Sequence, residues 1–188
     1  MNLLAAKESE SILSTKASKE GIIILSAQLV SIAPLVKASP TTASLAVVST
    51  ESEEVKEVCI KYPDILIHNR PEHLLKDADT VDVYVDVMKT FDGDDITHVV
   101  GLQPDNPDRS RNLDEILEYF VTKKYDDLVT VGVDGTRNGS VRVIKSLFVI
   151  LDNVSRRVGS LQDDCTNIHN QKDLEIATER LLKRNENA

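Results

Sequence analysis

Short apolar runs alternate along this chain with amphipathic stretches whose apolar residues recur every three or four positions. Four of the runs have the length and the uninterrupted apolar character of strands that are covered on both faces. They are Leu45–Ser49, Ile65–Ile67, 97–102 and Leu128–Val133. Three stretches have the period of a helix with one buried face. They are Glu51–Lys61, Val81–Phe91 and 112–123. This alternation predicts a doubly wound, three-layer α/β sheet.

Other segments complete the predicted order of elements, and none of them divides the chain, so we expect a single domain over residues 1–188. The apolar stretch 21–37 is predicted to be a buried helix, because it is shorter than a membrane span and polar residues interrupt it. The remaining predictions are a first strand at Leu3–Ala6, a turn at Arg137–Gly139, an alternating run at Val141–Val143, a strand-forming run at Leu147–Leu151 and a closing helix at Asp173–Arg184.

The apolar run 97–102 stops abruptly at Gln103 and is followed by Pro104, which cannot donate a hydrogen bond to a neighbouring strand. We therefore predict that Val99–Leu102 is a central strand and that a rigid polar loop, 103–111, leaves its carboxyl end. Open α/β sheets bind their ligands at this edge.

Loops 7–20 and 69–79 are predicted to leave the same edge. The three loops carry cations and an acid, namely Lys7, Lys16, Arg70, Asp105 and Arg109. Cations neutralise phosphate oxygens and a carboxylate holds Mg²⁺, so the set suits a nucleoside triphosphate with its metal. Each residue taken singly is typical of a solvated surface, and the prediction depends on their convergence.

Charge and cysteine content narrow the function classes. The net charge of −9, without a basic cluster, argues against a nucleic-acid partner. Cys59 and Cys165 are too few for a disulfide framework or a four-ligand zinc site, which favours a reduced, cytoplasmic setting. We expect no membrane association.

Five segments carry recognisable motifs, and they stand at Val47–Val55, Asn69–Leu74, Leu102–Arg109, Arg137–Val141 and Asn167–Ala177. They read V-V-S-T-E-S-E-E-V, N-R-P-E-H-L, L-Q-P-D-N-P-D-R, R-N-G-S-V and N-I-H-N-Q-K-D-L-E-I-A. In this order they resemble motifs of the cytidylyltransferases that activate acidic sugars, the CMP-acylneuraminate and CMP-KDO synthetases. The family's motifs are V-V-S-T-D-D-E-E-I, R-P-x-x-L, L-Q-P-T-S-P-L-R, R-N-G-A-I and D-I-D-T-P-E-D-L-E-I-A.

The resemblance implies a Rossmann-like nucleotide-diphospho-sugar transferase sheet. It also implies transfer of CMP from CTP to an acidic sugar, with Mg²⁺ as cofactor and release of pyrophosphate. The nucleotide-binding positions that it implies are Leu4, Ala5, Ala6, Lys7, Lys16, Arg70 and Thr80. Gln103, Pro104, Asn106 and Asn138 correspond to the sugar side, and Asp105 and His169 to the metal site. Lys7, Lys16 and Asp105 are the implied catalytic residues.

The chain departs from the family at two places that bear on catalysis. Glu8, Ser9 and Glu10 stand in the phosphate loop, where the family has glycines and no acid. Asn167 and His169 replace two metal-binding aspartates, and neutral ligands hold Mg²⁺ more weakly. A non-catalytic nucleotide or nucleotide-sugar binder, acting as a subunit or regulator, therefore stays open, as does a nucleotidyltransferase for another base or acceptor.

The segment between Val133 and Arg137 is too short for the family's dimer arm. The apolar residues of 21–37 and of Leu147–Leu151 exceed what one sheet face needs. Large exposed apolar patches usually mark partner surfaces, so we expect a homodimer built from the sheet edge or the C-terminal third.

Overall fold

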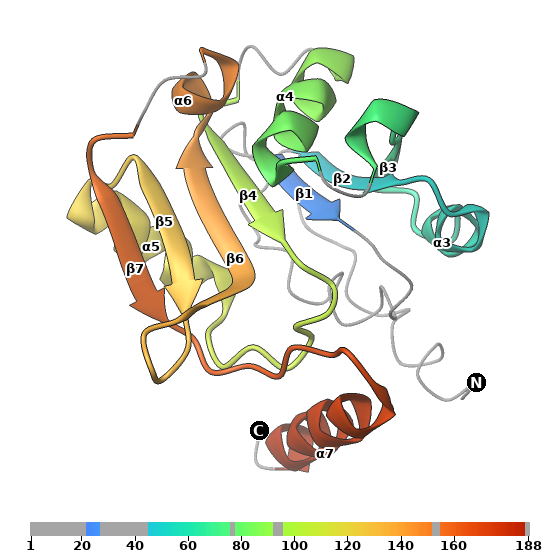
Figure 1. Cartoon of the computed structure of the whole chain (residues 1–188), viewed down its shortest axis with the longest axis vertical. Coiled ribbons are helices and arrows are strands. Elements are labelled where there is room, and N and C mark those ends of the chain that lie inside the picture. Colours follow the sequence, from blue (N-terminus) through green and yellow to red (C-terminus); the bar gives the residue numbers. More distant parts are fainter. Residues whose placement is uncertain (1–21, 27–44, 76–77, 92–95, 152–154, 187–188) are drawn as a thin grey trace.

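The computed structural model describes residues 22–26, 45–75, 78–91, 96–151 and 155–186 (Figure 1). These residues form a mixed seven-stranded sheet with the order β3-β2-β1-β4-β6-β5-β7. The strands are β1 Ile22–Ser26, β2 Leu45–Thr50, β3 Ile65–Asn69, β4 His98–Leu102, β5 Asp127–Val131, β6 Arg137–Lys145 and β7 Val158–Gln162. Only β6 runs antiparallel to its neighbours within this sheet. The central position of β4 confirms the prediction for Val99–Leu102.

Helices cover both faces of the sheet, as the three-layer prediction requires. They are α3 Glu53–Cys59, α4 Thr80–Thr90, α5 Leu113–Lys123, α6 Ser146–Ile150 and α7 Gln171–Glu186, with a 3₁₀ turn, η2, at Glu72–Leu74. On β4, Val100 packs with α3 and α5, whereas Val99 packs with α4 and α6. Successive strand residues point to opposite faces, so one apolar run contributes to two cores.

The helix predicted over 21–37 is wrong at residues 22–26, which form β1. This strand pairs in parallel with β2 and β4, with Ile22 opposite Leu45 and Val99. A buried strand and a buried helix produce the same uninterrupted apolar pattern, and here the β-branched isoleucines favour the strand. The predicted first strand, Leu3–Ala6, lies outside the described residues, and β1 occupies the place between β2 and β4.

The prediction of a strand over Leu147–Leu151 is also wrong, because Ser146–Ile150 forms the short helix α6. Val149 is fully buried while Leu147 and Ile150 are exposed, a spacing that fits one helical turn. The edge strand β7 was not predicted, since its residues V-G-S-L-Q contain few apolar positions. Gly159 admits the ring of Tyr125, whose atoms would lie 2.5 Å from an added Cβ.

The turn between β5 and β6 comes earlier than predicted. Gly132 N–H donates to the Thr136 carbonyl at 2.8 Å, and Gly135 has a φ of 81°. Arg137–Gly139 belongs to β6 instead, where Gly139 has a φ of 71° beside an irregularity in the pairing with β5. A left-handed glycine can occur in a bulge as well as in a turn, and this explains the displaced prediction.

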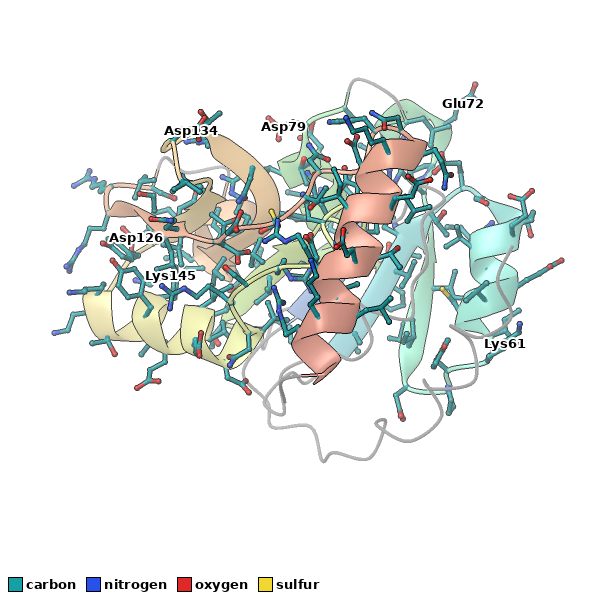
Figure 2. All side chains as sticks on the ribbon, turned by 90° about the horizontal axis from the view of Figure 1, so that it is seen from below. Lys61, Glu72, Asp79, Asp126, Asp134 and Lys145 are labelled. Atoms are coloured by element: carbon teal, nitrogen blue, oxygen red, sulfur yellow. The ribbon has the colours of Figure 1, made fainter. Side chains whose placement is uncertain are left out.

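The helix α7 lies apart from the two helical layers, across the carboxyl ends of the parallel strands (Figures 1 and 2). Of its side chains that the structure describes, only Ala177 is buried. Within the described parts of the chain, no helix has the length and apolar character needed to cross a membrane.

Candidate active site

The loop that follows β4 is folded into the protein. Gln103 N–H donates to the Ser140 carbonyl on β6 at 3.2 Å. Asn106 and Asp108 have no exposed surface, and Arg109 is 6% exposed. The Arg109 side chain donates to the Asn106 carbonyl at 3.4 Å, and burial lowers the pKa of its guanidinium. Arg109, which was predicted to be one of the cations that converge on a nucleotide, is instead buried and bonded within its own loop.

Asp163, which follows β7, ties this loop to the sheet. Its Oδ1 accepts the backbone N–H of Ser110 at 2.8 Å and that of Arg111 at 2.9 Å. The same oxygen accepts the Ser110 hydroxyl at 2.9 Å, and Oδ2 accepts the Ser140 hydroxyl at 2.8 Å. The carboxylate is completely buried, so four donors replace its water shell.

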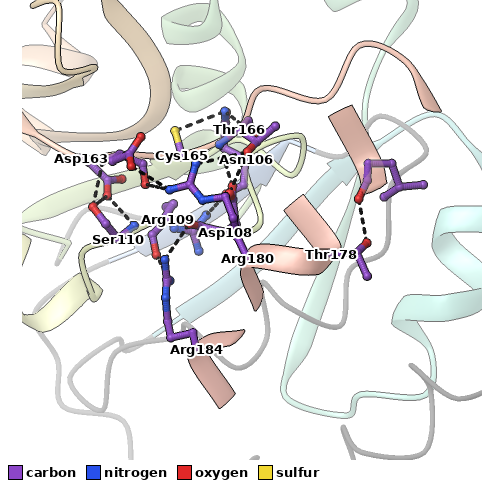
Figure 3. Close-up of polar contacts among 12 residues, drawn as sticks. Asn106, Asp108, Arg109, Ser110, Asp163, Cys165, Thr166, Thr178, Arg180 and Arg184 are labelled. Carbon is purple, nitrogen blue, oxygen red and sulfur yellow. Dashed lines mark hydrogen bonds and ion pairs between the residues drawn. The ribbon is translucent and has the colours of Figure 1, made fainter. Parts of the chain in front are cut away.

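Asp108 ties the loop to the segment that leads to α7. Its oxygens accept the backbone N–H of Thr166 at 2.7 Å and the Thr166 hydroxyl at 2.8 Å. Arg180 of α7 places its Nε 3.0 Å from Asp108 Oδ2, and Arg184 donates to the carbonyls of Asp108 and Arg109 (Figure 3). The two arginines hold the loop against α7, and we call Asp108, Arg180 and Arg184 the arginine clamp.

Asp105 and Asn106 differ from these neighbours, because each has a buried side-chain oxygen without a hydrogen-bond partner among the described residues. Asp105 is held by its backbone, since its carbonyl accepts the N–H of Ile168 at 2.9 Å. Desolvation raises the pKa of the Asp105 carboxyl, and the nearby His169 opposes that shift. An unpartnered carboxylate oxygen in this position is suited to receive a cation or a substrate hydrogen.

The donor set fits a weakly held divalent cation. In the described part of the chain, no group of three His, Cys, Asp or Glu residues is placed to hold a metal. Asp105 and His169 can supply one carboxylate and one imidazole, and Mg²⁺ commonly takes only one or two protein ligands besides phosphates and water. The exposed Asn167 adds no charge.

The predicted sugar-side residues gather beside Asp163. A Cβ on Gly139 would lie 3.0 Å from Gln103 Oε1, so the Gln103 side chain packs against the bulge in β6. Asn138 donates to the Asp163 carbonyl at 2.7 Å and accepts from the Thr130 hydroxyl at 2.7 Å. Pro104 is buried. Asn138 thus has internal partners, and its predicted contact with the sugar stays a prediction.

Arg70 and Thr80 lie on the other side of the sheet's centre, where β3 ends and α4 begins. The Arg70 guanidinium donates to the Ser49 hydroxyl at 3.2 Å through Nε and to the Ser49 carbonyl at 2.8 Å through Nη2. Desolvation lowers the pKa of Arg70, and Glu51 opposes that shift. β3 and β4 are separated by β1 and β2, hence by three strand spacings, about 14 Å.

Five implied nucleotide-binding positions fall outside the described residues, and they are Leu4, Ala5, Ala6, Lys7 and Lys16. Their roles stay predictions. The placement of β1 bears on them, because the chain leaves the carboxyl end of this strand after Ser26 and not after residue 6. The sequence offers Asp163 only as a possible substitute for the missing metal-binding aspartates, whereas its oxygens here hold the loop after β4. This role and the arginine clamp were not predicted, since the partners are far away in sequence.

Comparisons with known proteins agree with this fold. A family profile described as Cytidylyltransferase matches residues 32–175, well over half of the chain. A search of curated proteins finds no significant match. A solved 4-diphosphocytidyl-2C-methyl-D-erythritol synthase is 10% identical with a TM-score of 0.62, covering 86% of this chain and 98% of its own.

Two further solved structures share the fold. A cytidylyltransferase from Leptospira borgpetersenii serovar Hardjo-bovis (strain JB197) is 18% identical, with a TM-score of 0.52 and 84% coverage of both chains. A putative nucleotide-diphospho-sugar transferase from Desulfovibrio desulfuricans G20 is 9% identical, with a TM-score of 0.51, covering 77% of this chain and 80% of its own. At these identities the likeness shows only the fold, that of the nucleotide-diphospho-sugar transferases. The family is shown by the profile, and this chain belongs to the cytidylyltransferase family.

Proposed function

We propose that this protein transfers CMP from CTP to a hydroxyl group of an acidic sugar or a related small acceptor. The acceptor oxygen forms a bond to the α-phosphorus, the bond to the bridging oxygen breaks, and pyrophosphate leaves while the hydroxyl proton is lost. The observation that carries the proposal is the buried oxygen of Asp105 that has no hydrogen-bond partner among the described residues, in the loop at the carboxyl end of the central strand.

The proposed roles combine the positions of the described residues with the family resemblance. Asp105, with His169 beside it, would hold Mg²⁺, which when bound neutralises charge on the phosphates. Arg70 presents a planar guanidinium suited to phosphate oxygens, and Lys7 and Lys16 are proposed to add further cations. Gln103 is proposed to orient the acceptor by hydrogen bonding. The work of such a site is mostly positioning and charge neutralisation.

A second candidate function is binding without catalysis, as a subunit or regulator. The observation that favours it is the poor carboxylate supply, because Asn167 and His169 stand where the resembled family has metal-binding aspartates. A site with one carboxylate can bind a nucleotide and still hold its metal too weakly for turnover.

Pyrophosphate release separates the two functions. The protein is incubated with CTP and Mg²⁺ and with acidic sugars, neutral sugars or polyols in parallel. Acceptor-dependent release of pyrophosphate, lost in Asp105→Asn, supports the transferase. Saturable CTP binding, with no pyrophosphate released whichever acceptor is present, favours the binding function. If the protein neither binds CTP nor releases pyrophosphate, the whole proposal is contradicted.

A further inference from the structure

Four polar side chains are linked in a line by hydrogen bonds near the ends of β2 and β3. They are Arg70, Ser49, His68 and Asp86. Arg70 Nε lies 3.2 Å from Ser49 Oγ, and Ser49 Oγ lies 2.9 Å from His68 Nδ1. His68 Nε2 in turn lies 2.9 Å from Asp86 Oδ2 on α4. Ser49 is completely buried and His68 is 3% exposed. None of the roles proposed above uses Ser49, His68 or Asp86.

The direction of these hydrogen bonds follows from what each group can do. A guanidinium only donates, so Ser49 Oγ accepts from Arg70 and keeps its own hydrogen for His68 Nδ1. An imidazole that accepts at Nδ1 carries its hydrogen on Nε2, where it donates to the Asp86 carboxylate. One tautomer of His68 therefore gives each of these contacts one donor and one acceptor.

Hydrolase chemistry does not explain this line. A serine, a histidine and an aspartate in contact bring a nucleophilic triad to mind. The Ser49 hydroxyl, however, has no exposed surface and already accepts from Arg70, so it cannot reach a substrate. Both ends of the line are partly exposed, and they are Asp86 on α4 and Arg70. Of the two, Arg70 is the one that belongs to the predicted nucleotide loop, 69–79.

We propose that His68 is a positioning residue for the nucleotide: by holding the Ser49 hydroxyl in its accepting orientation, it fixes the Arg70 guanidinium for a phosphate of CTP. Two Arg70 donors then rest on Ser49, one on the hydroxyl and one on the carbonyl, so the plane of the guanidinium is set before the ligand arrives. The inference rests on the proposed function, since it takes CTP as the ligand of Arg70.

Two matched substitutions separate positioning from mere packing. In His68→Asn the amide oxygen can replace Nδ1 as the acceptor for Ser49, while the contact with Asp86 is lost. In His68→Gln the longer amide can still reach Asp86, while the acceptor for Ser49 is lost. Both variants remove the same ring from the same packing site, so a purely structural role would affect both alike.

We expect His68→Gln to raise the dissociation constant for CTP by about tenfold, as Arg70→Ala does, and to raise KM more than it lowers kcat. His68→Asn should bind CTP within about twofold of the wild type. The Nε–H resonance of Arg70 in the free protein gives a second readout: it should stay protected from solvent exchange in His68→Asn and lose that protection in His68→Gln.

The outcomes are distinguishable. If the wild-type protein does not bind CTP, the proposed function fails and the positioning role fails with it. If the wild type binds CTP and Arg70→Ala weakens binding, but the two His68 variants bind equally, only the positioning role is overturned. If both variants unfold, the Arg70 resonance in Ser49→Ala decides, because loss of the hydroxyl should expose the Nε–H and unchanged protection would contradict the line of contacts.

Discussion

Three aspartates at the carboxyl edge of the sheet differ in how their oxygens are used. Asp163 and Asp108 accept several donors each and are completely buried. Asp105 keeps one buried oxygen without a partner among the described residues. Buried carboxylates with hydrogen-bond partners stabilise the fold, whereas a buried carboxylate oxygen without a partner destabilises it. A ligand that contacts this oxygen offsets that destabilisation. Asp163 and Asp108 therefore have structural roles, whereas Asp105 is the candidate for a functional one.

Replacing Asp105 by Asn should leave the melting temperature at pH 7 unchanged or raise it, while it abolishes turnover. The pKa of Asp105 is raised in the folded protein, so the charged form is penalised above that pKa. The penalty disappears as the pH falls through the folded pKa towards the unfolded value. Calorimetry between pH 4 and 8 checks the direction of this dependence. A clearly lower melting temperature in Asp105→Asn would contradict the assignment.

Cys165 should be almost unreactive in the native protein. Burial and the neighbouring Asp163 raise the pKa of its thiol to about 11. Only about one molecule in a thousand then carries the thiolate at pH 8, and the thiolate is the reactive form. Alkylation with iodoacetamide, followed by mass spectrometry, should speed up about tenfold per pH unit towards that value. Rapid stoichiometric labelling at pH 8 would refute it.

At the scale of elements, local signals explain which segments were predictable. β2, β3 and β4 follow from apolar runs, and the loop after β4 follows from Pro104, which no central strand accepts. Three helices follow from their period and begin after capping side chains, which are Ser52, Asp79 and Asn112. β1 and α6 were misassigned because a short apolar run does not reveal whether its period is that of a strand or of a helix.

The candidate site was predictable only in part for the same physical reason. Asp105 was singled out because it belongs to the loop that ends the central strand. The role of Asp163 depends on Ser110 and Ser140, and that of Asp108 on Thr166 and α7, across more than twenty residues in each case. Such partners meet only through the strand order, which no local pattern contains.

The arginine clamp should stabilise the protein measurably. Arg180→Ala leaves the completely buried Asp108 carboxylate without its cation, although Thr166 still donates to it. We expect a loss of about 1–3 kcal/mol in the free energy of unfolding, because Arg180 itself is partly exposed. Denaturant titration checks this, with Lys172→Ala on the exposed side of α7 as the control. Equal effects of the two substitutions would show that Asp108 does not need Arg180.

At the scale of the whole molecule, four of the exposed apolar side chains lie between residues 147 and 158. Leu147, Ile150, Leu151 and Val158 are 57%, 48%, 56% and 52% exposed. They belong to α6, its end and the start of the edge strand β7, all in the C-terminal third. An edge strand with an exposed apolar residue can pair with a second copy, and the expected homodimer stays a prediction.

Light scattering at micromolar concentration should therefore give the mass of a dimer, and Val158→Asp should shift it to a monomer. The charge would face its own copy across a twofold axis and repel it. Glu118→Lys on α5 serves as a charge-changing control elsewhere on the surface. A monomer mass for the wild type at every concentration would exclude this interface.

The central claim is the proposal that CTP and its metal bind at the carboxyl edge of the sheet, between Arg70 and the loop after β4. A crystal structure with a non-hydrolysable CTP analogue and Mn²⁺ tests it most directly, since anomalous scattering locates the metal. The account predicts a metal within about 2.5 Å of Asp105 Oδ1, with phosphate oxygens in hydrogen-bond reach of Arg70. An analogue bound away from both residues, or a metal held without Asp105, would contradict it.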